Sequence, residues 1–142
     1  LQYIANPSER VQMAAVKSNY LALRYIQNPT LDILKAAVLQ DPQAMRQITN
    51  LDLDTVVELL KVSTLILGYV PKQIGLTVDM VRQIITEMIA NPAVEDRYVR
   101  ELVSNPAIGG RQSTWPIDVL SLVDAYGSIE AKKIAIDQYL LY

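Results

Sequence analysis

Apolar and polar positions in the first half of the chain follow a pattern that recurs at a constant offset. Three short motifs carry the recurrence: Leu-x-Tyr-Ile at 1–4 and 23–26, Asn-Pro at 6–7 and 28–29, and Ala-Ala-Val at 14–16 and 36–38. The same offset leads on to Asn50 and to the apolar stretch 67–70. Self-similarity at a fixed short period is typical of helical repeat proteins. The sequence therefore predicts three repeat units over residues 1–70, of which the third is degenerate.

Within a unit, the spacing of apolar residues predicts a longer helix followed by a shorter one. We expect longer helices over 7–17 and 29–40, and shorter ones over 20–26 and 42–48. The residues expected to face inward from the longer helices are Val11, Ala14, Ala15 and Ser18 in the first unit and Leu31, Leu34, Ala37 and Val38 in the second.

Proline following Asn or Asp is expected to mark helix starts. Proline suits the first helical position, and the Asx side chain before it can cap the free N–H groups of the first turn. Five prolines have this context: Pro7, Pro29, Pro42, Pro92 and Pro106.

The second half of the chain is also expected to be helical, because no segment alternates long enough to predict a strand. The pattern predicts one long helix over 52–67, a loop over 68–76, a helix capped by Thr77, a diverged unit with its helix over 92–104, a loop over 107–114, and two helices over 116–126 and 128–141, separated by Gly127. The predicted fold is all-α, a solenoid-like array of short helical repeats with a helical C-terminal cap. Residues 1–70 form the repeats and residues 71–142 the diverged repeat and cap of the same domain.

A single unit of this length is too short to bury its apolar face alone, so neighbouring units must stack. By the repeat spacing, Leu1 lies in the middle of a unit, and no capping segment precedes it. We therefore expect further units upstream, within a longer protein.

The composition supports a packed domain and removes several kinds of chemistry. Apolar residues make up 51% of the chain, which is enough for a sizeable core. The chain has no Cys and no His, and their absence removes thiolate chemistry, the commonest metal ligand and the commonest general base. No nucleophile stands beside a base at a recognised spacing. We expect a protein that is not an enzyme, with no catalytic, cofactor or metal residues.

Acidic residues gather at one helix start, at Asp52, Asp54 and Glu58. They lack the intervening glycine turn of a calcium loop, so helix capping and the helix dipole account for them. The chain has no apolar run long enough to span a membrane and no secretion signal. The cytoplasm or a virion is the expected location.

Residues 6–26, with their echo as far as Ile48, resemble a short helical repeat of unknown function. The residues that carry the resemblance are Ala14-Ala15-Val16-Lys17-Ser18-Asn19 and Ala22-Leu23-Arg24-Tyr25-Ile26. Such repeats are found in large bacterial and bacteriophage proteins. Beyond Asn50 the likeness fades, since Glu58-Leu59 replaces the alanine pair. The resemblance implies a repeat scaffold within a larger polypeptide, of phage or bacterial origin, and it implies no activity.

Aromatic and basic residues also recur at the repeat spacing. Tyr3, Tyr25 and Tyr69 share one position of the unit, and Arg24 and Arg46 share the preceding one. These side chains can form a row that contacts a partner. Alternatively, the tyrosines pack between successive units and the arginines pair with neighbouring carboxylates.

The loop 107–115 is a second candidate for partner contact, because it holds Arg111 and the only tryptophan, Trp115. Both residue types are favoured at binding hot spots. The structural alternative is that Trp115 closes the core beside the next helix start.

The function expected from these features is a structural or protein–protein interaction module. It would contact a protein partner or its own parent chain through Arg24, Tyr25, Arg46, Tyr69, Arg111 and Trp115. The alternative is a nucleic-acid contact through the periodic Tyr and Arg positions. It is less favoured because the thirteen basic residues are scattered among fifteen acidic ones, for a net charge of −2.

Overall fold

The computed structural model describes residues 8–108 and 115–140, and all regular structure in these ranges is helical. In chain order the elements are the α-helices and 3-10 helices (η) α1 (Glu9–Ser18), η1 (Tyr20–Tyr25), α2 (Leu31–Gln40), η2 (Pro42–Gln47), α3 (Leu53–Leu60), η3 (Thr64–Tyr69), η4 (Lys72–Ile74), α4 (Val78–Ala90), α5 (Asp96–Ser104), α6 (Val119–Tyr126) and α7 (Ile129–Leu140). The predicted all-α class is thus confirmed.

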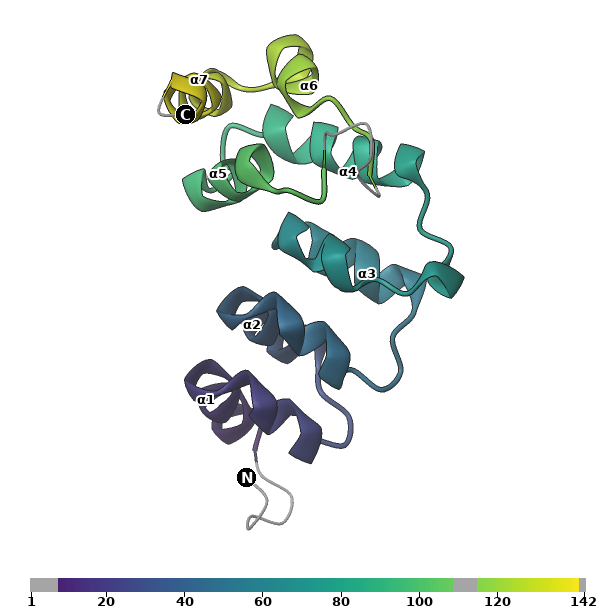
Figure 1. Ribbon diagram of the computed structural model, residues 1–142. Coiled ribbons are helices and arrows are strands. Elements are labelled where there is room, and N and C mark those ends of the chain that lie inside the picture. The colour runs from purple at the N-terminus through teal and green to yellow at the C-terminus, as the bar shows by residue number, and fades with distance from the viewer. Residues whose placement is uncertain (1–7, 109–114, 141–142) are drawn as a thin grey trace.

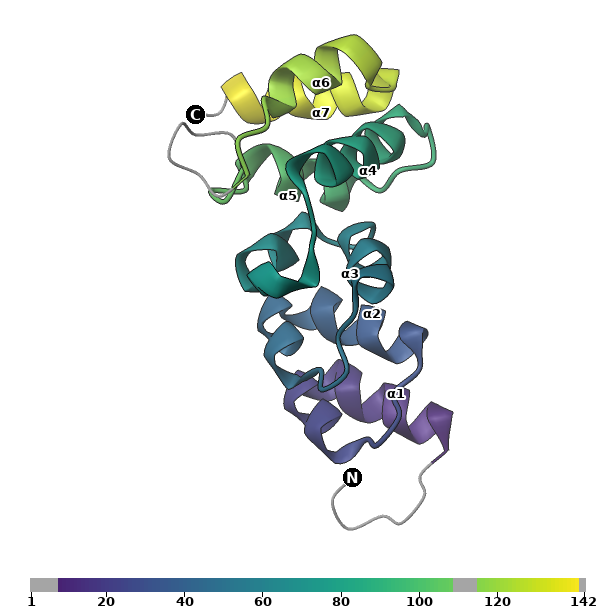
Figure 2. The same cartoon turned by 90° about the vertical axis from the view of Figure 1, so that its right-hand side faces the viewer.

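The first six elements form three α–η pairs, whose α-helices begin at Glu9, Leu31 and Leu53 and so keep the constant offset of the sequence motifs. α1 packs on α2 and α2 on α3, while η1 packs on η2 and η2 on η3. Figure 1 shows the α-helices one above another from the N-terminal end, and Figure 2 shows the α and η elements as two adjacent columns. The predicted short helices over 20–26 and 42–48 are present as η1 and η2.

Equivalent side chains begin every α-helix of these pairs. Ser8, Thr30 and Asp52 each accept a hydrogen bond from the backbone N–H three residues later. This satisfies one of the N–H groups that a helix start leaves without an intrahelical partner. A second set, Asn19, Asp41 and Ser63, bends the chain between the two helices of each pair.

These bend residues share one conformation, with φ between −155° and −158° and ψ between 114° and 126°. The side chain of each accepts from the N–H two residues on, which starts the 3-10 helix. The long helix predicted over 52–67 was wrong for this reason. α3 ends at Leu60 with Lys61 as its C-cap, and Ser63 then starts η3 as Asn19 and Asp41 start η1 and η2, even though the apolar pattern continues through it.

The expectation that Asx-Pro marks helix starts was correct only at Pro42, the first residue of η2. Pro29 lies one residue before the cap Thr30, because the threonine hydroxyl accepts a hydrogen bond from the N–H of Ile33 in the first turn of α2. Pro92 and Pro106 lie in turns instead, because the side chain of the Asn before each proline accepts from the N–H of the Ala after it. Pro7 lies outside the described residues.

The core runs as one cluster through the described helices. Val16, Val38 and Leu60, at equivalent positions of the three pairs, are all buried. Leu31, which was expected to face inward, is exposed, and Ile33 takes the buried place. The beginning of α2 is therefore rotated relative to the expected face.

The first pair also departs from its expected inward face. Val11, Ala14 and Ser18 are exposed, and Ala15 is partly buried. Helix α1 packs on α2 along one side only, so the positions on its other side stay open to solvent within the described part of the chain.

Polar contacts also join successive pairs. The side-chain amide of Gln40 accepts from the N–H of Tyr20 and donates to the carbonyl of Lys17, so it spans the bend between α1 and η1. Thr30 donates to Glu9 at 3.0 Å across the same junction. Because both partners of Gln40 belong to the bend, this amide holds the second pair in register with the first.

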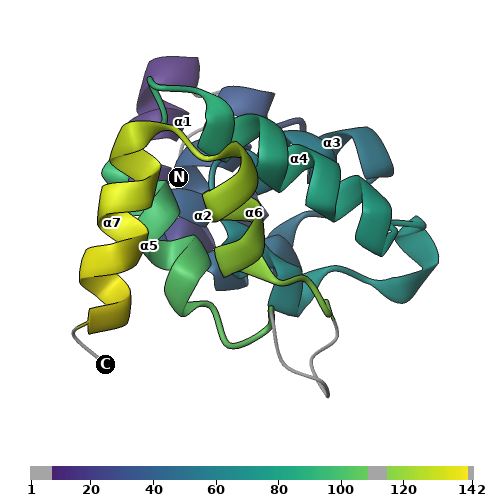
Figure 3. The same cartoon turned by 90° about the horizontal axis from the view of Figure 1, so that it is seen from above.

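The helices after η3 close the other end of the stack. α6 lies along α4 and α7 along α5, as the view in Figure 3 shows. Thr77 caps α4, as predicted. α6 begins at Val119, later than predicted, because Asp118 caps it by accepting from the N–H of Ser121 at 3.1 Å.

Gly127 ends α6, but not in the left-handed conformation that favours glycine at helix ends. Its φ is −67° and its ψ is 147°. A Cβ at this position would lie 2.5 Å from the carbonyl oxygen of Val123. The close approach of Gly127 to the carbonyl of Val123 in the last turn of α6 is what requires glycine here.

α5 is attached to the bend between α3 and η3 by three polar side chains. Arg97 donates to the carbonyl of Val62 at 2.9 Å, and Ser63 donates to Glu101 at 3.1 Å. The buried Asn105 amide donates to the backbone oxygen of Thr64 at 2.9 Å. α5 therefore docks through hydrogen bonds to the same bend that Ser63 creates.

Two capping carboxylates make the free energy of unfolding depend on pH in the acidic range. The pKa of Asp52 is lowered by hydrogen bonds from the side chain and backbone of Thr55, and that of Asp118 by those from Ser121. A lowered folded-state pKa means that this stabilisation is present above the unfolded-state pKa and is lost as pH falls through the folded value. We expect the free energy of unfolding to fall more steeply below about pH 4 in the wild type than in the doubly substituted Asp52→Asn, Asp118→Asn variant.

Asparagine is the matched substitution, because it caps a helix about as well as aspartate without titrating. Urea denaturation at pH 7, 4 and 3 measures the effect. Identical pH profiles for the two proteins would contradict a role for the caps in acid sensitivity.

Candidate interaction surface

The Tyr and Arg positions singled out from the sequence lie at the ends of the 3-10 helices. Arg24 and Tyr25 end η1, Arg46 lies near the end of η2, and Tyr69 ends η3. Arg24, Tyr25 and Arg46 are exposed, Tyr25 to 47%, and Tyr69 is partly buried. Because η1, η2 and η3 pack side by side, these residues form one row, here called the η edge. Tyr3 lies outside the described residues.

Arg46 and Tyr69 are in direct contact along this row. The guanidinium carbon of Arg46 lies 5.1 Å from the centroid of the Tyr69 ring, within the range of a cation–π interaction. The contact joins consecutive α–η pairs, since Arg46 belongs to the second and Tyr69 to the third. It places the guanidinium group over the ring while leaving Arg46 exposed.

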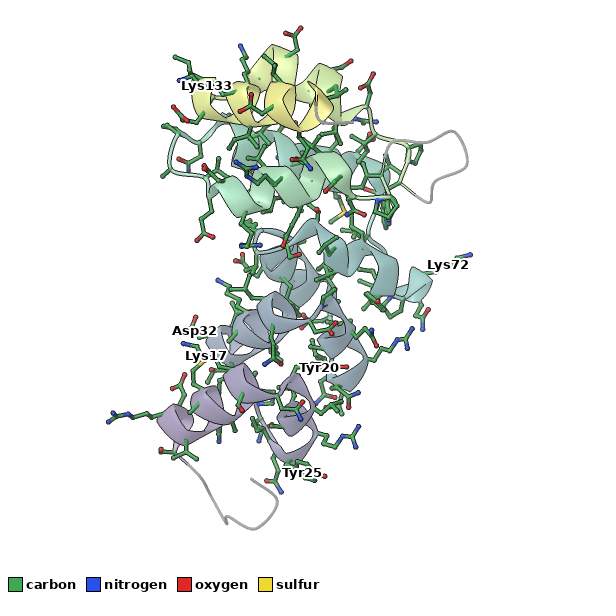
Figure 4. The ribbon with its side chains drawn as sticks, turned by 60° about the vertical axis from the view of Figure 1, so that its left-hand side comes forward. Lys17, Tyr20, Tyr25, Asp32, Lys72 and Lys133 are labelled. Atoms are coloured by element: carbon green, nitrogen blue, oxygen red, sulfur yellow. The ribbon has the colours of Figure 1, made fainter. Side chains whose placement is uncertain are left out.

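Charge is unevenly divided between the two columns of helices. Segments 19–27, 41–49 and 63–76 carry three basic residues, Arg24, Arg46 and Lys72, and a single acidic one, Asp41. The Asp41 carboxylate already accepts from the N–H of Gln43 at 2.9 Å. In Figure 4, Lys72 projects from the side opposite to Lys17 and Asp32, and Tyr25 lies at the lower end. The η edge is thus locally basic on a chain of net charge −2.

Trp115 lies against η3, the 3-10 helix that ends at Tyr69. Its ring is buried, and its indole N–H donates to the carbonyl of Leu67 at 3.4 Å. With Leu76 and Val78 it lines a pocket of about 520 Å³. Arg111 lies outside the described residues, so the structure places only Trp115 of this predicted pair.

A second pocket, of about 370 Å³, lies where α2 and α3 meet the segment before α5. Lys35, Lys61 and Arg97 line it together with Glu95. Arg97 is held by Glu101 at 2.9 Å and Glu95 at 3.3 Å. Lys61 is paired with Glu58 of α3 at 3.4 Å, so two of the three cations around this pocket have a carboxylate partner.

Tyr98 also lines this pocket, and its hydroxyl is buried without a hydrogen-bond partner among the described residues. Burial raises the pKa of Tyr98, and the nearby Glu101 raises it further. Sequence reasoning did not single out this residue. Its position could have been recognised from the helical spacing of α5. Tyr98 precedes Glu101 by three residues and Leu102 by four, so it lies on the boundary between the charged and apolar faces.

Neither pocket has the lining that acid–base catalysis by paired carboxylates requires. Glu95 is the one carboxylate around the pocket beside α5, and the pocket beside Trp115 has none. Within residues 8–108 and 115–140, no three acidic residues lie close enough to hold a metal ion. None of the helices in these ranges is long and apolar enough to cross a membrane.

Comparison with known proteins adds no assignment. No protein-family model, no curated protein and no solved structure matches the chain.

Proposed function

We propose that the chain is a non-catalytic helical-repeat module, solenoid-like in its first half, whose η edge binds an acidic segment of a protein partner. The observation that carries the proposal is the exposed row of Arg24, Tyr25 and Arg46, with Arg46 oriented on the ring of Tyr69 at 5.1 Å. Arginine and tyrosine are the residue types enriched at interaction hot spots. The constant spacing of helices, caps and bends supports the repeat arrangement.

The chemistry of the row favours a partner that carries carboxylates. Arginine binds carboxylates through paired N–H donors, and ring stacking pre-orients the guanidinium plane for such contacts. Asp41 is engaged in capping and does not neutralise the row through an ion pair with Arg24 or Arg46 within the described part of the chain.

Binding of a defined acidic probe tests this proposal. We expect fluorescein-labelled polyglutamate peptide to bind the wild type in low salt, and the Arg24→Glu, Arg46→Glu variant to bind it about tenfold or more weakly, because two contacts become repulsive. Fluorescence anisotropy gives both affinities. The matched control is Arg10→Glu, Lys17→Glu, which makes the same charge change at exposed residues of α1. Equal weakening in both variants would reduce the effect to net charge and contradict a specific η edge.

Contact with nucleic acid through the same row is the second candidate, and the exposure of Tyr25 favours it. Aromatic rings at regular spacing can stack on successive bases. A labelled oligothymidylate in the same assay separates the two. Tighter binding of the oligonucleotide than of polyglutamate, lost in the Arg24→Glu, Arg46→Glu variant, would replace the protein partner with single-stranded nucleic acid.

A further inference from the structure

Burial at equivalent positions differs between the first α–η pair and the second. Ile33, Ala37 and Ala44 of the second pair are each 0% exposed. Their equivalents one repeat earlier are Val11, which is 40% exposed, and Ala15 and Ala22, which are partly buried. We call the surface formed by Val11, Ala15 and Ala22 the leading face of the first pair.

The central apolar positions of the two pairs do not differ in burial. Val16 and Leu23 are as completely buried as Val38 and Met45, their equivalents in the second pair. The interior of the first pair is therefore fully formed, and only its leading face lacks cover. In the second pair the same positions are buried because the first pair packs on them.

The sequence before α1 indicates what would fit this face. Residues 1–7 read Leu-Gln-Tyr-Ile-Ala-Asn-Pro and residues 23–29 read Leu-Arg-Tyr-Ile-Gln-Asn-Pro, so five of seven are identical. Residues 23–29 are the end of η1 and the link to the second pair. The segment before the first pair thus has the sequence of a link between pairs.

We propose that the leading face is a stacking surface for one further α–η pair of the same design, joined through residues 1–7. Val11 would occupy the place of Ile33 in such a junction, with Ala15 and Ala22 allowing the close approach that Ala37 and Ala44 allow in the second pair. The opposite end of the three pairs does not offer a second copy the same partner surface, because α5 already packs on η3 there. The inference rests on the repeat arrangement proposed above.

The test uses the whole chain with a copy of residues 7–22 placed directly before Leu1. Residues 1–6 then complete the added pair, since they match residues 23–28. We expect the melting temperature to rise by roughly 5 °C, because a capping pair adds its own interface. The matched control carries the same added residues in shuffled order and should melt as the unextended chain does. No rise in the extended chain, or an equal rise in both, overturns the proposal.

Val11→Asp makes the test specific for the leading face. Val11 is 40% exposed in the unextended chain, so we expect a shift of about 1 °C or less there. In the extended chain the same substitution should remove the gain, because the carboxylate would be buried at the new junction. A rise in melting temperature that survives Val11→Asp would show that the added pair packs elsewhere.

Analytical ultracentrifugation of the unextended protein tests whether a second copy of the chain binds the leading face instead. We expect a monomer, and a dimer that dissociates on Val11→Asp would assign the leading face to a second copy and overturn the proposal. The polyglutamate assay is independent of these results. If the melting temperature does not rise but Arg24→Glu, Arg46→Glu still weakens polyglutamate binding, only the further pair is contradicted. If the melting temperature rises but this variant binds polyglutamate as the wild type does, only the acidic partner is contradicted.

Discussion

The Val38→Asp substitution is expected to unfold the three α–η pairs at neutral pH. Val38 is 1% exposed in the last turn of α2, and its equivalents Val16 and Leu60 are both fully buried. Burying an unpaired carboxylate costs several kcal/mol, which is comparable with the roughly 5–15 kcal/mol that stabilises a whole domain. Circular dichroism should show a large loss of helicity at 25 °C and no cooperative melting transition.

Leu39→Asp is the matched control, because it makes the same chemical change at the next residue of the same helix. The Leu39 side chain is 50% exposed. Its substitution should therefore leave helicity unchanged and lower stability by about 0.5 kcal/mol or less. Retained helicity and a cooperative transition in Val38→Asp would show that α2 does not pack through Val38.

The second large effect is expected at Asn105, which docks the end of α5 on η3. Its amide group donates to the backbone oxygen of Thr64 at 2.9 Å and to the Thr64 hydroxyl at 3.3 Å, and its oxygen accepts from Ala107 at 2.9 Å. Asn105→Asp keeps the shape and the acceptor, but it replaces the donor contact with the Thr64 carbonyl by repulsion between oxygens and places a charge at a buried site. We expect a loss of about 3–5 kcal/mol in the free energy of unfolding, measured by urea denaturation at pH 7.

The chain supplies a matched control in Asn91, which begins the other Asn-Pro-Ala sequence. Its side-chain oxygen also accepts from the N–H two residues on, at 2.9 Å from Ala93, but the residue is exposed. Asn91→Asp retains this acceptor and buries no charge, so the expected change is within about 0.5 kcal/mol. Equal losses in the two variants would assign the effect of Asn105 to the turn and not to Thr64.

The sequence was sufficient to predict the all-helical class, the places of η1 and η2 and the Thr77 cap, because periodicity and capping are local properties. It failed at Ser63, where the apolar pattern runs through a bend and the serine hydroxyl starts a new 3-10 helix. It also failed at Pro29 and Pro92. The first residue of a helix is set by the side chain that accepts from its free N–H groups, and a nearby proline does not identify that side chain.

The candidate site was predictable in part. The row of Arg24, Tyr25, Arg46 and Tyr69 followed from the repeat spacing, since residues one period apart align when pairs stack. The contact of Arg46 with Tyr69 could not be read from the sequence, because it joins different positions of consecutive pairs. The unpartnered hydroxyl of Tyr98 was hidden for a related reason: its surroundings come from α2, α3 and the segment before α5, which only the fold brings together.

The polar groups that join the helices differ from one junction to the next, and this gives the stack an order. Apolar positions such as Val16, Val38 and Leu60 are nearly interchangeable, so they do not distinguish one neighbour from another. The amide of Gln40 fits the bend before Tyr20, and the guanidinium of Arg97 fits the carbonyl of Val62. Exchanging two pairs would preserve the apolar contacts but leave these donors and acceptors without hydrogen-bond partners. The hydrogen bonds thus determine which pair follows which, whereas the apolar core stabilises the stack whatever the order of the pairs.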